Sequence, residues 1–104
     1  MAFFAVTTEH GPAWDDTRPI RQQLAWDEHA AFMDGLVADG LVIMGGPVGD
    51  GQQALLVMEA PSPGAIRARF EQDPWVVADL LRLGRVQPWS IWLDGREKAI
   101  RNAG

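Results

Sequence analysis

The 104-residue chain contains neither cysteine nor tyrosine. The absence of cysteine excludes disulfides, thiolate nucleophiles and cysteine-ligated zinc. The absence of tyrosine removes a common proton donor. Acid–base chemistry near neutral pH is therefore left to the two histidines, His10 and His29, or to a carboxyl group in an unusual environment.

Positive charge is scarce. The chain has 9 Lys and Arg against 14 Asp and Glu, a formal net charge of −5, and Lys98 is its single lysine. Nucleic acids and anionic membranes are bound by clustered basic residues, whereas those of this chain are scattered. We expect no nucleic acid and no membrane as a partner.

Long hydrophobic runs are also missing. The longest are four or five residues, as at 41–44, which is too short to span a bilayer. The N-terminus lacks the basic segment of a signal peptide, so we expect a cytoplasmic protein. Hydrophobic residues still make up 47% of the chain, enough for one core. We expect a single domain over residues 1–94 and a polar tail over 95–104.

The first part of the chain predicts a strand, a loop and a helix. Residues 2–8 mix aromatic and β-branched side chains, as strands do, and 11–19 shows no periodicity. Apolar residues recur at helical spacing over 20–39, and Gly40 suits a left-handed helix end.

A hairpin is predicted next. The apolar run 41–44 is typical of a strand buried on both faces, and the glycines that follow indicate a tight exit from it. Gly49-Asp50-Gly51 predicts a turn, and 54–59 predicts the strand that pairs with the first.

The last part predicts a broken helix and a final strand. Ser62 is a suitable cap for a helix that has Pro63 in its first turn, and Asp73 is a suitable cap for a second segment that starts at Pro74 and runs to Gly84. Residues 86–93 predict the last strand, at an edge or with a bulge because of Pro88. The order is βαββαβ, a ferredoxin-like α+β fold with both helices on one face of the sheet.

The uncovered face of this sheet suggests a homodimer. Helices cover only one face, yet 86–93 is apolar on both sides and 41–44 does not alternate. A second copy of the same face is the simplest cover. We expect dimerisation through the open sheet face.

His29 lies at the centre of the apolar side of the first helix. At 100° per residue, its apolar neighbours lie within about 60° of it; they are Ala25, Trp26, Phe32, Met33 and Leu36. It could be a hydrogen-bonded core histidine, or a general base on a cleft wall beside a carboxylate.

Asp73 has two interpretations as well. As an N-cap it needs only one carboxylate oxygen. If the other oxygen met a ring nitrogen of His29, Asp73 would fix the tautomer while His29 moves the proton.

Other motifs are less informative. His10 follows the first strand and is expected to be solvated, or to form a second polar wall of a cleft. Asp27 and Glu28 lack a second histidine at helical spacing, so no metal site is expected. The glycines at 45–49 lack a nucleotide-binding fingerprint, although ligand could approach bare backbone there.

Several motifs together resemble the YciI-like, or YCII-related, family. They are His29, the segment Phe32–Val48 with its Gly-Leu and Gly-Pro pairs, and Asp73-Pro74-Trp75. The resemblance extends from Phe3 to Leu93. It implies a dimeric α+β barrel with His29 and Asp73 as the active-site pair. One relative is a dehydrochlorinase of a chlorinated hydroxyhydroquinone. Trp26 departs from the family, where an Arg is often found.

We therefore expect a small-molecule enzyme that needs no cofactor, with its pocket between the sheet and the first helix. His29 would abstract or deliver a proton in an elimination or isomerisation, and Asp73 would orient it. The expected substrate-binding residues are Trp26, Phe32, Met33, Gly46 and Trp75.

Other functions remain open. The same pocket could bind a hydrophobic ligand without turnover. The fold also serves cofactor-free monooxygenases and muconolactone-isomerase-like enzymes. A chain that only dimerises is a further alternative, although a buried histidine is costly unless it is paired.

Overall fold

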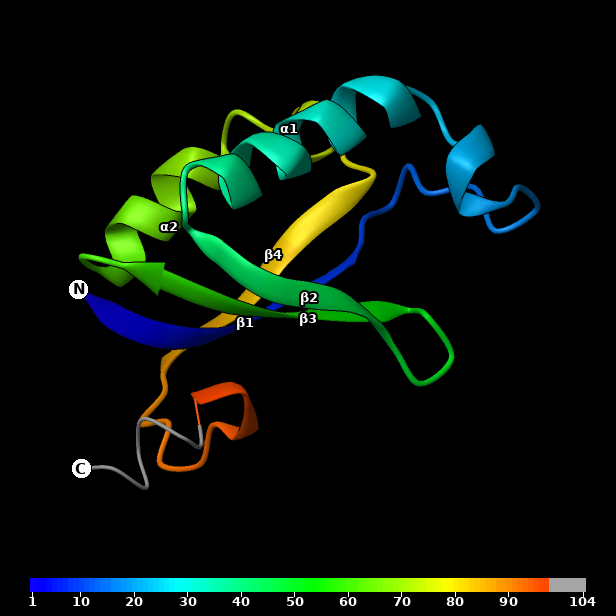
Figure 1. Cartoon of the computed structure of the whole chain (residues 1–104). Coiled ribbons are helices and arrows are strands. Elements are labelled where there is room, and N and C mark those ends of the chain that lie inside the picture. Colours follow the sequence, from blue (N-terminus) through cyan, green and yellow to red (C-terminus); the bar gives the residue numbers. More distant parts are fainter. Residues whose placement is uncertain (98–104) are drawn as a thin grey trace.

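The computed structural model describes residues 1–97 and has a four-stranded antiparallel sheet with its helices on one face (Figure 1). The strands are β1 (Ala2–His10), β2 (Val42–Val48), β3 (Gln53–Ala60) and β4 (Leu81–Pro88), in the order β2-β3-β1-β4. The helices are α1 (Trp26–Ala38), α2 (Pro63–Phe70) and α3 (Pro74–Val77), and the 3₁₀ turns are η1 (Ile20–Gln22) and η2 (Gly95–Glu97). The predicted ferredoxin-like order is confirmed.

The core lies between the helices and the sheet. Alternate residues of β1 and β3, such as Val6 and Met58, are buried under the helices. Leu36 of α1 and Ile66 and Phe70 of α2 pack against them. In the part of the chain that the structure describes, no helix is long and apolar enough to cross a membrane.

Helix α1 begins at Trp26, six residues after the predicted start at Ile20. Ala25, directly before it, has a left-handed backbone with φ of 58°, which no helix can continue through. Ile20–Gln22 forms the separate turn η1, and Gln23 is extended. Alanine is a strong helix former, so the composition gave no sign of this break.

Strand β2 is longer and less buried than predicted. It continues through the Gly45-Gly46-Pro47 segment, which is therefore part of the strand and not its exit. Because β2 is an edge strand, the sheet tolerates Pro47 there, although proline has no amide hydrogen to donate. Met44 is 48% exposed in the single chain, so one copy does not bury both faces of this strand.

The end of the broken helix and the final strand were also misplaced. Helix α3 is a single turn, and the chain leaves it through Asp79, whose φ is 62°. Strand β4 then starts at Leu81, where Leu81 and Leu83 are more buried than Arg82 between them. It ends at Pro88, on the sheet edge predicted for this residue. The predicted polar tail starts in η2, and its remainder, 98–104, lies outside the described residues.

Candidate functional site

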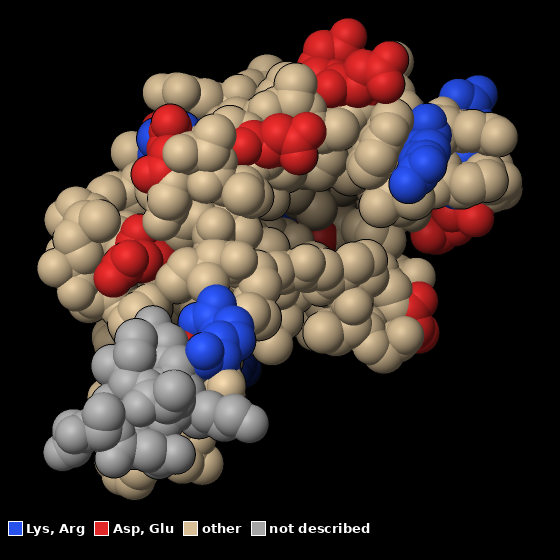
Figure 2. Space-filling view, viewed as in Figure 1, with Lys and Arg blue, Asp and Glu red and all other residues tan. Residues whose placement is uncertain are grey.

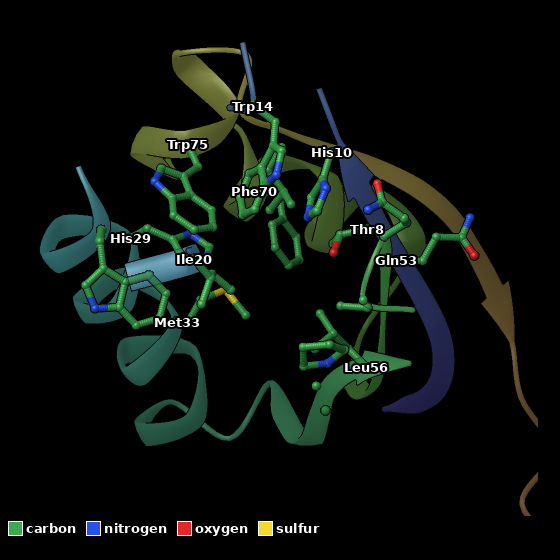
Figure 3. Close-up of a pocket in the computed structure, with 18 residues that line it drawn as sticks. Thr8, His10, Trp14, Ile20, His29, Met33, Gln53, Leu56, Phe70 and Trp75 are labelled. Carbon is green, nitrogen blue, oxygen red and sulfur yellow. The ribbon is translucent and has the colours of Figure 1, made fainter. Parts of the chain in front are cut away.

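A cavity of about 320 Å³ lies between the helical layer and the sheet. It is visible as a hollow in the middle of a mostly uncharged surface (Figure 2). Helix α1 contributes His29 and Met33 to one side, and the sheet contributes Thr8 and Leu56 to the other (Figure 3). The side of α1 that faces the sheet and the side of the sheet that faces the helices therefore form its walls.

His29 and Asp73 meet at this cavity, although they are 44 residues apart in the sequence. Nδ1 of His29 lies 2.9 Å from Oδ1 and 2.9 Å from Oδ2 of Asp73. The Asp73 side chain is fully buried, and that of His29 is 11% exposed. Because a carboxylate can only accept a hydrogen bond, Nδ1 carries the proton, which leaves Nε2 as the ring nitrogen that can exchange a proton with a bound molecule.

The start of α3 explains the position of Asp73. Pro74 occupies the first helical position, and Asp73 has the extended backbone of an N-cap. Its Oδ1 accepts a hydrogen bond from the amide of Trp75 at 3.0 Å. The expected cap and the expected contact with His29 therefore occur together on one carboxylate.

Trp75 fixes the plane of the His29 ring. The two rings are stacked at a centroid distance of 3.8 Å and an angle of 5°. Trp75 is 2% exposed, and its indole Nε1 donates to the carbonyl of Leu24 at 2.6 Å. Trp26 and Trp14 pack against other sides of the same indole, at 5.7 and 5.4 Å. The imidazole is thus held by Asp73 at its edge and by Trp75 on its face.

The loop before α1 brings Trp14 to the cavity. Gly11 and Ala13 donate backbone hydrogen bonds to Leu80 and Asp79, in the turn between α3 and β4. A side chain at position 11 would overlap the Asp79 carbonyl, which explains the glycine.

Two polar side chains hold this loop in place, Gln23 from its buried side and Asp15 from its exposed side. The buried Gln23 side chain bonds the backbone of Asp15 and Arg18. Hydrogen bonds from the hydroxyl and the amide of Thr17 lower the pKa of the Asp15 carboxyl.

Four of the five residues expected to bind substrate line the cavity: Trp26, Met33, Gly46 and Trp75. Phe32 does not, because it points to the core and packs edge-on against Phe70 at 5.9 Å. Among residues 1–97, no three His, Cys, Asp or Glu side chains gather in a way that could hold a metal ion.

Of the two expectations for His10, the structure agrees with the polar wall of a cleft and not with a solvated side chain. His10 is the last residue of β1, half-buried, and it lines the cavity from the sheet side. Its ring stacks on Trp14 at 3.6 Å and 9°. The alternation of β1 was a usable signal, because His10 is in phase with the buried Phe4, Val6 and Thr8.

The loop and the hairpin also contribute to the lining, with Trp14, Ile20 and Gln52, none of which was among the expected substrate-binding residues. Trp14 and Gln52 lie in segments without periodicity, and Ile20 lies at the start of a segment that was expected to be helical. Only the tertiary fold places these segments over the cavity.

Comparisons with known proteins agree with this architecture. A structure of 5-chloro-2-hydroxyhydroquinone dehydrochlorinase from Burkholderia phenoliruptrix AC1100, in complex with 2,5-dihydroxybenzoquinone, matches with a TM-score of 0.51 and 24% sequence identity. The match covers 91% of this chain and 97% of the dehydrochlorinase. No curated protein matches the sequence. The model of the YCII-related domain matches residues 2–90, and the chain therefore belongs to the YCII-related domain family.

Proposed function

We propose that this protein is a small-molecule enzyme that transfers a proton with His29 and needs no cofactor. The observation that supports this most directly is the paired imidazole at the cavity: Nδ1 is bound by both oxygens of a buried carboxylate, and the side chain lines the cavity. Such a pair holds one tautomer and stabilises the imidazolium that forms when Nε2 takes a proton.

The cavity is suited to a small, flat molecule. Its volume of about 320 Å³ lies at the lower end of the range of small-molecule sites, roughly 300–1,000 Å³. Indole rings of Trp14, Trp26 and Trp75 line it, so a planar ring would find stacking partners. The similar fold of a dehydrochlorinase supports the same class of substrate.

Two reactions fit this arrangement. In an elimination, Nε2 of His29 takes a proton from the substrate, the electron pair of the broken bond forms a new double bond, and chloride leaves with its own bonding pair. In an isomerisation, the imidazolium returns the proton at another atom of the same molecule. Asp73 remains a carboxylate throughout and keeps the ring in place.

Turnover of chlorinated hydroxyhydroquinones tests the proposal. We expect the purified protein to release chloride from such a compound, or to isomerise an enolic analogue, without added metal or nucleotide. Chloride release and ultraviolet spectra would be recorded across a panel of ring substitutions. Saturable binding of the whole panel without turnover of any compound would favour a binding module instead.

We also propose that a second copy covers the open sheet face. Hydrophobic side chains of β2 and β3 on this face are exposed, with Met44 at 48%, Val48 at 44% and Leu55 at 36%. Met44 pairs with Val57 and Gly46 with Leu55, so Met44 and Leu55 are diagonal neighbours on the two strands. Two copies of one self-complementary face form a closed dimer.

Leu55→Glu is expected to convert the dimer to a monomer, because it would bring like charges together across the two-fold axis. Sedimentation equilibrium at micromolar concentration would measure this. Val77→Glu is the matched control: Val77 is 73% exposed but lies on α3, on the helical side of the sheet. A wild-type protein that sediments as a monomer would rule out this dimer.

A further inference from the structure

Nδ1 of His10 is a buried polar atom without a hydrogen-bond partner, and within residues 1–97 it is the single buried side-chain nitrogen or oxygen in this situation. A buried polar group left without a partner is costly, and such groups are uncommon in folded proteins. The atom belongs to a ring that lines the cavity. A bound molecule is the natural partner for it.

The ring of His10 is held in position by its neighbours. It stacks on Trp14 at 3.6 Å, and its backbone pairs with Leu81 of β4. His10 enters the cavity from β1, whereas His29 enters from α1 (Figure 3). The two imidazoles therefore approach a bound molecule from different layers of the fold.

The sheet side of the cavity is polar but uncharged. Thr8 and Gln52 line it together with His10. His10 and Gln52 also line a second depression beside the hairpin turn, where Glu9 and Asp50 add negative charge outside the main cavity. None of the described residues that line the main cavity is Asp, Glu, Lys or Arg. Hydroxyl or carbonyl oxygens suit these side chains, since no charged partner is present for a ligand anion.

We propose that His10 is a ligand-binding residue that hydrogen-bonds, through Nδ1, an oxygen of the molecule whose proton His29 moves. The inference rests on the proposed function for the identity of that molecule. It adds a selection rule: the preferred ligands are uncharged rings with oxygen substituents at two separate positions, one for each histidine. A ring with a single polar edge would leave Nδ1 of His10 buried and unpaired.

Ligand titrations of wild type and His10→Phe test this role. Phenylalanine keeps a flat ring against Trp14 and removes both nitrogens. Hydroquinone and toluene serve as probes, because they share the ring and differ in the two oxygens. Quenching of the cavity tryptophans reports binding. We expect His10→Phe to weaken hydroquinone binding about five- to tenfold and to change toluene binding less than about twofold.

The outcomes separate binding from packing. An equal loss for both probes would show that His10 only shapes the cavity and would overturn the proposal. Unchanged hydroquinone affinity, or no saturable binding of hydroquinone to wild type, would also overturn it. Ring ¹⁵N resonances of His10 in the wild type give a second readout, independent of any variant: they should shift with hydroquinone and stay in place with toluene.

This test is independent of turnover. If no substrate is converted but the difference between hydroquinone and toluene disappears in His10→Phe, the proton-transfer function fails while the role of His10 stands. If turnover depends on His29 but His10→Phe changes the binding of hydroquinone and toluene equally, the proton-transfer function stands and the proposed role of His10 fails.

Discussion

His29→Asn is expected to lower kcat/KM by about 10²–10⁴-fold, the usual contribution of a general acid–base residue. Asparagine keeps a polar group near Asp73 but has no nitrogen that can take up a proton at neutral pH. The rate would be measured with whichever chlorinated or enolic substrate wild type converts. Product binding should change much less than the rate, because cavity walls such as Trp14 and Met33 are left intact.

Asp27→Asn is the control for this variant. Asp27 is an exposed residue in the first turn of the same helix, so its substitution alters local charge and leaves the cavity unchanged. Its rate should stay within about twofold of wild type, as for surface changes away from a site. If His29→Asn retained the wild-type rate, proton transfer through His29 would be excluded.

Asp73→Ala is expected to reduce the free energy of unfolding by about 2–4 kcal/mol. The change removes the cap of α3, worth about 1 kcal/mol. It also leaves Nδ1 of His29 in a nearly buried position without its partner, at about 1–3 kcal/mol. Urea unfolding at a fixed protein concentration would measure the loss.

Ser62→Ala separates the two contributions. Ser62 caps α2 by accepting from the amide of Ala65 at 3.1 Å, and it is exposed. We expect the free energy of unfolding of this variant to fall only by the contribution of a helix cap, about 1 kcal/mol. If Asp73→Ala cost no more than Ser62→Ala, the contact with His29 would contribute nothing to stability. Asp73→Asn, which keeps an oxygen for the amide of Trp75, should fall between the two.

The fold was predictable because its signals are local. Helix caps at Ser62 and Asp73, a left-handed Gly40 and the hairpin turn at 49–51 depend on a few neighbouring residues each. Local signals could not establish that His29 reaches Asp73, since nothing in either segment encodes the packing of α1 beside α3. The resemblance to a family supplied the pairing that periodicity could not.

The errors came from places where tertiary contacts override local preference. Alanine at position 25 favours a helix, yet this residue has a left-handed backbone. Two residues before it, the Gln23 side chain is hydrogen-bonded to the backbone of Asp15 in the loop. The leucines at 80 and 81 fit a helix and a strand equally well, and the turn at Asp79 decides between them. Solvent exposure was one expectation for His10 because β1 was expected to end two residues earlier than it does.

Asp73 both caps α3 and contacts His29, and this affects what its presence in other members of the family can show. A carboxylate that starts a helix is kept by selection for folding, whether or not the protein carries out the proposed reaction. Retention of the Asp-Pro pair is therefore weak evidence of activity. Position 29 is the more informative marker, because another flat ring could stack on Trp75 in place of the imidazole. Relatives with an intact Asp-Pro pair and a phenylalanine at that position would be the first candidates for binding proteins that evolved from enzymes.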